Sequence, residues 1–143
     1  MAFVLDASVT MAWCFGDESD AFTDLTLERC RKESALVPGL WTLEVINVLL
    51  VAERRSRIEP ADSARFIELL RGLPIEVQWG PQLNEDSMRF DVARRHRLSS
   101  YDAAYIALAM RRGVPLATND DRLARAASTE GVELVRADSE SGS

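Results

Sequence analysis

Short apolar runs of strand type alternate along this chain with longer segments of helical periodicity. Such alternation is typical of an α/β sandwich with a mostly parallel sheet and right-handed crossovers. The 143 residues suffice for one compact domain with its own core. We predict an α/β domain over residues 1–136 with a five-stranded sheet, followed by a disordered tail over residues 137–143. The predicted strands are residues 2–6, 34–38, 74–79, 114–118 and 132–136, and the predicted helices are residues 20–32, 41–56, 61–71, 82–96, 100–112 and 120–129.

Four carboxylates stand in or at the end of strongly apolar runs. Asp6 ends AFVLD and Asp120 follows VPLATN, while Glu44 and Asp102 are the only charged residues in ALVPGLWTLEVINVLLVA and LSSYDAAYIALAM. Burying a polar group without a partner costs about 2–7 kcal/mol, and no Lys or Arg is adjacent in sequence to any of the four. Mg²⁺ and Mn²⁺ prefer oxygen ligands and would relieve the repulsion among such acids. The pattern predicts a metal-dependent enzyme.

The predicted strands bring two of these acids to one edge of the sheet. Ligands of open parallel sheets bind beyond the carboxyl ends of the strands, near the point where strand order reverses. Asp6 and Asp120 close the two most apolar predicted strands. If these strands are neighbours, the two carboxylates meet, and Glu44 and Asp102 face the same edge from the starts of helices.

Helix capping is an alternative explanation for two of the acids. Ser99 and Asp102 have the spacing of a capping box, as do Thr118 and Asp121, and Asp120 could itself cap a helix. Capping alone would account for Asp102 or Asp120 about as well as a metal site would.

The other two acids differ in how well a structural role explains them. Asp6 could be a turn residue or a helix cap, and Ser8 could be a cap or could orient Asp6. Glu44 lies inside a helix otherwise composed for burial, and Asn47 shares its face three residues later. A single site explains all four acids more economically than four separate structural roles.

Other compositional features exclude several classes of protein. The N-terminus lacks a secretory signal, and no charge-free apolar run approaches the length of a membrane span, so we expect a cytoplasmic protein with reduced Cys14 and Cys30. His96 is the only histidine, which excludes a zinc site built on several histidines and favours a surface position. The three tryptophans are expected in the core or in an interface; they are Trp13, Trp41 and Trp79.

The cations are nearly all arginine, because Lys32 is the single lysine. The net charge of −6 argues against nonspecific nucleic-acid binding over the whole surface. Arg94, Arg95 and Arg97 form one local cluster, which could contact phosphates or could be a solvated helix end favoured by the helix dipole.

Four segments resemble the acidic motifs of PIN-domain ribonucleases, and more narrowly those of VapC toxins of toxin–antitoxin modules. The segments are FVLDAS, LWTLEVINVL, SSYDAAYIALA and LATNDDRL, in that order, and the resemblance spans residues 3 to about 136. It implies a PIN-like three-layer α/β/α sandwich. It also implies an endoribonuclease that hydrolyses RNA phosphodiester bonds with Mg²⁺, for which Mn²⁺ can substitute, and that acts as a toxin inhibiting translation and growth.

The resemblance also implies roles for particular residues. By this resemblance Asp6, Glu44, Asp102 and Asp120 would be the metal-binding acids, while the role of Asp121 stays open. We hypothesise further that Asp6, Asp102 and Asp120 bind metal, Asp120 directly or through water, and that Glu44 holds or deprotonates the attacking water. The same resemblance gives Ser8 and Thr118 as supporting residues. From its position on the face of Glu44 we add Asn47 as a supporting residue, and we hypothesise that the RNA follows Arg94, Arg95 and Arg97.

The resemblance implies three kinds of partner: an RNA substrate (tRNA, rRNA or mRNA), a cognate antitoxin and a second copy in a homodimer. A non-catalytic RNA-binding or scaffold domain of the same fold is the alternative. This sequence lacks residues that two other α/β classes require. A receiver domain needs a lysine late in the chain, and no lysine follows Lys32. A haloacid-type phosphatase needs Asp-x-Asp after the first strand, and position 8 is Ser.

Overall fold

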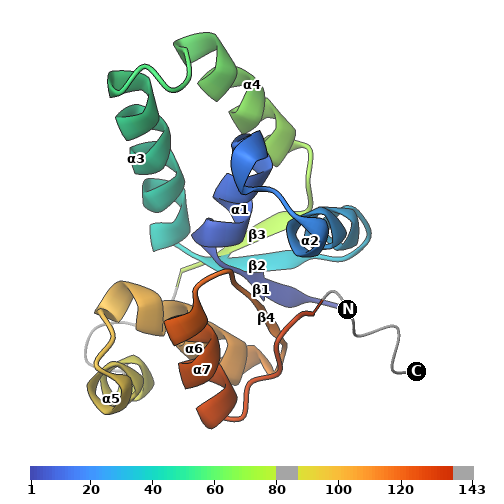
Figure 1. The fold of residues 1–143 in the computed structure, drawn as a ribbon. Coiled ribbons are helices and arrows are strands. Elements are labelled where there is room, and N and C mark those ends of the chain that lie inside the picture. The colour runs from blue at the N-terminus through green and yellow to red at the C-terminus, as the bar shows by residue number, and fades with distance from the viewer. Residues whose placement is uncertain (80–86, 137–143) are drawn as a thin grey trace.

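A four-stranded parallel sheet with the order β3-β2-β1-β4 forms the centre of the computed structural model, which describes residues 1–79 and 87–136 (Figure 1). Val4 lies opposite Leu36 on one side and Leu116 on the other. The strands β1 and β4 are therefore neighbours, as the placement of the acids required. The strands are β1 (Phe3–Leu5), β2 (Ala35–Pro38), β3 (Ile75–Gln78) and β4 (Leu116–Ala117).

Helices cover both faces of the sheet, which confirms the predicted α/β/α sandwich (Figure 1). The first four helices lie on one face and the last three on the other. On the first face are α1 (Ala7–Cys14), α2 (Ala21–Lys32), α3 (Leu40–Arg54) and α4 (Pro60–Arg71), with the short 3-10 turn η1 (Gly16–Glu18) between α1 and α2. On the second face are α5 (Ser87–His96), α6 (Ser100–Arg112) and α7 (Asp121–Thr129).

Two elements differ from the sequence prediction. The predicted fifth strand contributes only a bridge between Leu134 and Leu116, because β4 has just two residues with which to pair. Helix α1 was not predicted, since most of its residues are buried and it shows no polar face to mark the helical period. The beginning of the predicted helix 82–96 and the tail 137–143 lie outside the described residues.

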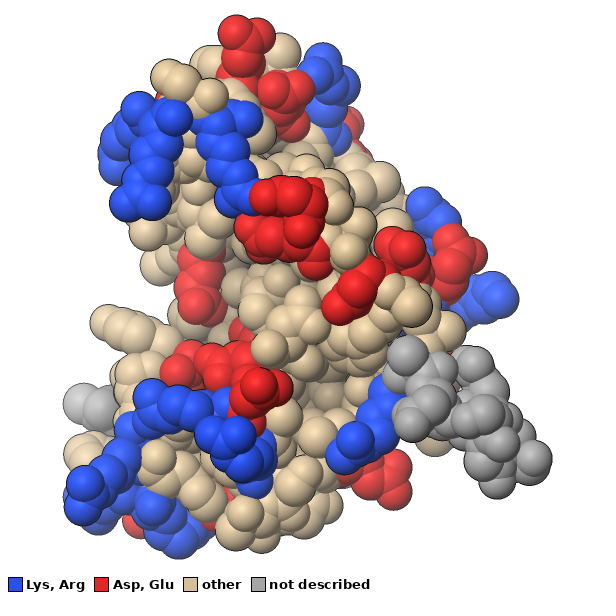
Figure 2. Space-filling view, in the orientation of Figure 1, with Lys and Arg blue, Asp and Glu red and all other residues tan. Residues whose placement is uncertain are grey.

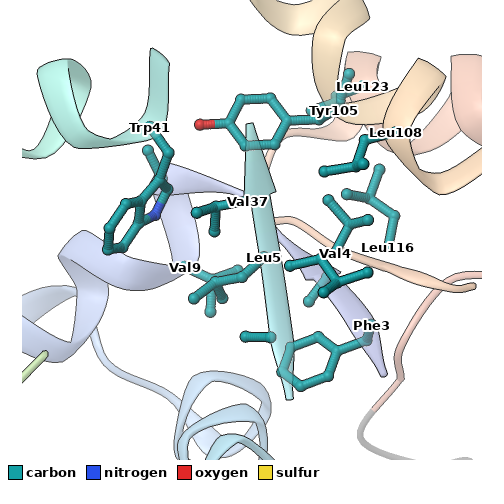
Figure 3. Packing of buried hydrophobic residues seen from close by; sticks show 14 of the residues in the cluster. Phe3, Val4, Leu5, Val9, Val37, Trp41, Tyr105, Leu108, Leu116 and Leu123 are labelled. Atoms are coloured by element: carbon teal, nitrogen blue, oxygen red, sulfur yellow. The ribbon is translucent and has the colours of Figure 1, made fainter. Parts of the chain in front are cut away.

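The sheet is buried on both faces, which explains why its strands read as continuous apolar runs. Phe3, Val4 and Leu5 are fully buried, and Tyr105 and Leu108 of α6 pack with them (Figure 3). This packing holds the carboxyl ends of β1 and β4 in fixed positions.

The tryptophans occupy three environments. Trp41 is buried and its indole Nε1 donates to Thr10 Oγ1, while Trp13 is half-buried. Trp79 is 81% exposed and its ring lies against Gly39, so it is not a core residue, and its place in an interface stays a prediction. No helix among residues 1–79 and 87–136 is long and apolar enough to cross a bilayer.

Candidate active site

The four carboxylates line one cleft of about 440 Å³ at the carboxyl edge of the sheet. Asp6 follows β1 directly, Asp120 precedes α7, Glu44 lies in the second turn of α3, and Asp102 lies in the first turn of α6. The sequence prediction that these residues share one edge is thus met by the topology. The other lining residues are Ala7, Ser8, Met11, Phe15, Glu18, Val48, Arg57 and Asn119. We call this hollow the acidic cleft.

Two hydroxyl groups orient the most buried acid. Asp6 is 6% exposed, and its Oδ2 accepts hydrogen bonds from Ser8 Oγ at 2.7 Å and from Thr118 Oγ1 at 2.6 Å. Each hydroxyl in turn accepts a backbone N–H, from Asn119 at Ser8 and from Asp120 at Thr118, both at 3.0 Å. These N–H groups occupy hydroxyl lone pairs, so both hydroxyl protons are free to point at Asp6. Ser8 and Thr118 therefore both contact Asp6, and their role in supporting a metal site stays a prediction.

Glu44 has a hydroxyl partner that the sequence analysis missed. Tyr105 of α6 is fully buried, and its hydroxyl donates to Glu44 Oε1 at 2.5 Å. Figure 3 shows this hydroxyl pointing toward the helix that carries Trp41, which is α3. The spacing of Asp102 and Tyr105 was the available signal, because residues three apart share a helix face.

Helix capping was the alternative explanation for Asp102 and Asp120, and it accounts in part for Asp120 alone. Asp120 Oδ1 accepts from the backbone N–H groups of Arg122 at 2.9 Å and Leu123 at 3.2 Å, so Asp120 is the cap of α7. At α6 the cap is Ser99, whose Oγ accepts the N–H of Asp102 at 3.1 Å. The carboxylate of Asp102 makes no hydrogen bond to any described residue. Helix capping therefore leaves Asp102 unexplained.

Mutual repulsion connects the four acids. Burial raises the pKa of Asp6, Glu44 and Asp102 above their usual values. Repulsion adds to the rise of each pKa: Asp102 acts on Asp6, both of these act on Glu44, and Asp120 acts on Asp102. Within the described part of the chain none of the four forms a salt bridge. The site therefore concentrates negative charge with little compensation.

One cationic side chain, Arg57, lines the acidic cleft, but it pairs with two other acids and not with any of the four carboxylates. Its Nη2 donates to both oxygens of Asp17, at 2.8 and 3.0 Å, and to Glu18 Oε2 at 3.0 Å. Its guanidinium carbon lies 3.9 Å from the centre of the Phe15 ring. Asp17 and Glu18 together more than balance this arginine, so it adds no net positive charge to the cleft.

Some predicted site residues lie outside this cleft. Asn47 and Asp121 are exposed and are not among its lining residues. Arg94 stacks on Phe90, with its guanidinium carbon 5.0 Å from the ring centre. Arg95 forms two hydrogen bonds to Glu130, both 2.9 Å long. The role of these arginines in RNA binding stays a prediction.

The fit of a metal ion rests on the chemistry of the donors. Among residues 1–79 and 87–136, no three His, Cys, Asp or Glu side chains converge closely enough to form a metal site. The cleft nevertheless offers carboxylate oxygens, which are the donors that Mg²⁺ prefers. The carboxylate of Asp102 makes no hydrogen bond within the described chain, so it is available to a cation, and both hydroxyl hydrogen bonds to Asp6 reach Oδ2 and not Oδ1. The residues fit a hard divalent cation, provided that the side chains draw closer around it.

Comparison with known proteins identifies the family. A model of the PIN domain matches residues 3–128. The structure of PAE2754 from Pyrobaculum aerophilum is similar, with 26% identity, a TM-score of 0.69, and coverage of 94% of this chain and 84% of that chain. Comparison with curated protein sequences gives no match.

Two toxin–antitoxin structures share the fold at low identity. VapBC2 from Rickettsia felis, bound to a DNA fragment from its promoter, is 10% identical with a TM-score of 0.67, and the match covers 94% of this chain and 97% of that chain. VapBC-1 from nontypeable Haemophilus influenzae is 13% identical with a TM-score of 0.64, with coverage of 94% and 96%. The family match covers most of the chain and includes all four acidic residues. The chain is a member of the PIN domain family.

Proposed function

We propose that this protein is a Mg²⁺-dependent endoribonuclease that serves as the toxin of a toxin–antitoxin pair. The observation that carries the proposal is the acidic cleft, where four carboxylates meet without a salt bridge in the described structure. Membership of the PIN domain family and the fold shared with VapBC proteins support a nuclease toxin. Burial raises the pKa of Asp6, Glu44 and Asp102, and acids with raised pKa values gathered in a cleft are characteristic of catalytic sites.

Each acid has a proposed role. Asp6 and Asp102 hold the principal metal ion, and Asp120 holds a metal directly or through water. A bound Mg²⁺ polarises the phosphate and lowers the pKa of a coordinated water. Glu44 accepts a proton from the attacking water, a task suited to a carboxyl group whose pKa is raised toward neutrality.

The surrounding side chains keep these acids in position. Ser8 and Thr118 hold Oδ2 of Asp6. The Tyr105 hydroxyl restrains Glu44 in the same way. No protein nucleophile is required, because water attacks the phosphate directly in metal-assisted hydrolysis.

We propose two protein partners in addition to RNA. A cognate antitoxin would bind this chain, by analogy with the VapBC structures, and a second copy would complete a homodimer. The RNA belongs to one of three classes (tRNA, rRNA or mRNA), and sequencing of cleaved ends in cells that express the protein without its antitoxin would identify it.

The decisive experiment measures cleavage of RNA with Mg²⁺, with Mn²⁺ and with EDTA. Asp6→Asn and Asp120→Asn should each slow cleavage at least about a hundredfold, because several kcal/mol of transition-state stabilisation depend on the metal. Asp121→Asn is the matched control, since Asp121 is adjacent but exposed and outside the cleft. An Asp6→Asn protein that cleaves as fast as wild type would refute the assignment.

The alternative is a non-catalytic RNA-binding or scaffold domain of the same fold, which would hold no metal in the acidic cleft. Calorimetric titration with Mn²⁺ separates the two functions. The nuclease should bind Mn²⁺, and Asp6→Asn should weaken binding. A scaffold domain should show no binding.

A further inference from the structure

A second hollow, of about 250 Å³, lies beside the acidic cleft and has the opposite charge. It is lined by His96, Leu98, Arg122, Arg125, Ala126 and Thr129, from α7 and from the end of α5 and the connection to α6. We call it the arginine cavity. In Figure 2, Lys and Arg side chains over α5 to α7 lie directly below a band of acidic residues.

The first turn of α7 connects the two hollows. Asp120 caps this helix and lines the acidic cleft, and Arg122 lies two residues later and lines the arginine cavity. Arg122 is therefore near enough to the cleft to act on a ligand that extends from it.

The two arginines of this cavity keep their charge uncompensated. Arg122 Nη2 donates to the backbone carbonyl of Arg97 at 3.0 Å, and neither Arg122 nor Arg125 forms a salt bridge within the described residues. Arg95 differs, because Glu130 binds its guanidinium through two hydrogen bonds. An arginine bound only to a carbonyl retains its full charge and most of its five donors for a phosphate.

We propose that Arg122 and Arg125 bind a phosphate of the RNA strand that enters the acidic cleft. This inference rests on the proposed nuclease function and adds a substrate-binding site to it. A protein with a net charge of −6 repels RNA overall, so it needs a local cationic site next to the chemistry. The guanidinium forks of Arg122 and Arg125 present that charge in the geometry that phosphate oxygens accept.

The test compares Arg122→Gln, Arg125→Gln and the double variant, all in full-length protein that also carries Asp6→Asn to prevent cleavage. The probe is a short single-stranded RNA, bound in EDTA at a series of salt concentrations. The slope of log affinity against log salt should fall by about 0.7 for each phosphate that the variant no longer neutralises. We expect the double variant to bind RNA about tenfold more weakly at 0.15 M salt and with a shallower slope.

The matched control for loss of one positive charge is Arg65→Gln. Arg65 is exposed on α4, outside both hollows, and pairs with Asp62. An equal Kd and an equal salt slope in the double variant and in Arg65→Gln would overturn the proposal.

A structural role of Arg122 is tested separately, because its bond to Arg97 could stabilise the turn between α5 and α6. Arg122→Lys keeps the charge but not the guanidinium fork, so it should keep the salt slope of the unsubstituted protein while losing part of the affinity. Arg125 makes no comparable bond to a described residue, so Arg125→Gln should weaken RNA binding with an unchanged Tm. When Arg125→Gln is placed in the protein that keeps Asp6, the KM for RNA cleavage should rise while kcat stays within about threefold of the wild-type value. The proposal would be contradicted if RNA binding weakened only in those variants whose Tm also falls.

Failure of the proposed function gives a different result. A wild-type protein that cleaves no RNA with any divalent metal, yet binds it through Arg122 and Arg125, would refute the nuclease and retain the phosphate site.

Discussion

Glu44 and Glu130 are two largely buried carboxylates that the fold treats in opposite ways. Glu130 receives two hydrogen bonds from Arg95 and one contact from His96 at 2.7 Å, and these partners lower its pKa. Among the residues that the structure describes, Glu44 receives a hydrogen bond from the Tyr105 hydroxyl alone, and burial raises its pKa. The protein therefore supplies cations to Glu130 but forms no salt bridge to Glu44 among the described residues.

This difference separates a structural carboxylate from a functional one. Glu130 ties the end of α7 to α5, and its charge is favourable in the folded protein. The acids of the cleft are charged at a cost in stability, as is common in sites adapted for catalysis. Removing charge should consequently have opposite effects on stability in the two regions.

The largest stability effect is expected from Asp6→Asn in metal-free protein. An asparagine still accepts the hydrogen bonds of Ser8 and Thr118 but carries no buried charge. We expect the free energy of unfolding at pH 7.5 to rise by about 2 kcal/mol, in the range that mutational data give for an uncompensated buried polar group. Urea unfolding in EDTA measures this change, and a stability equal to or below that of wild type would contradict it.

The pH dependence of stability sharpens the same comparison. The folded state binds protons more tightly at Asp6, Glu44 and Asp102 than the unfolded chain does, so stability falls as pH rises through their raised pKa values. Glu130 acts in the opposite sense, but its contribution is lost only as pH falls below the unfolded pKa, near 4.

Metal-free wild-type protein should therefore have a higher Tm at pH 5.5 than at pH 8, and Asp6→Asn should flatten the dependence. Adding Mg²⁺ or Mn²⁺ should raise the Tm most at pH 8, where the carboxylates are ionised. Thermal melts at both pH values, with and without metal, measure this. A Tm that rises with pH in EDTA would show that cations compensate the cleft after all.

Glu130→Gln should have a smaller effect and the opposite sign. Loss of the charge weakens the bonds to Arg95 and His96, so the free energy of unfolding should fall by about 1 kcal/mol. RNA cleavage should be unchanged, because Glu130 lies outside the acidic cleft. Urea unfolding and a cleavage assay of the same preparation test both statements, and a loss of cleavage at unchanged stability would contradict them.

The sequence predicted the acids better than it predicted their surroundings. Alternation of apolar runs placed β1 and β4, and a carboxylate in an apolar run was visible without any knowledge of tertiary packing. The hydroxyl of Tyr105 was missed because a tyrosine in an apolar helix looks like a core residue, and only the packing of α6 against α3 gives it a polar partner.

The arginines were predicted less well for a related reason. Clustering in sequence drew attention to Arg94, Arg95 and Arg97, yet Glu130 binds Arg95 from 35 residues away. Arg122 and Arg125 are separated by two residues in an ordinary amphipathic helix, so nothing in the sequence distinguishes them. Whether an arginine is compensated depends on tertiary contacts, which local sequence patterns do not contain.

The smallest effect is expected from Tyr105→Phe, which removes the hydroxyl partner of Glu44. That hydroxyl lowers the pKa of Glu44 against the effect of burial, so its loss should raise the pKa further. If Glu44 is the base, the acidic limb of kcat/KM against pH should move to higher pH, with a loss of a few-fold near pH 6 and little change at the plateau. Tyr101→Phe is the matched control, since Tyr101 lies on the same helix but is 64% exposed. A profile identical to that of Tyr101→Phe would mean that the proton is accepted elsewhere, and the contrast between Glu44 and Glu130 would then concern stability alone.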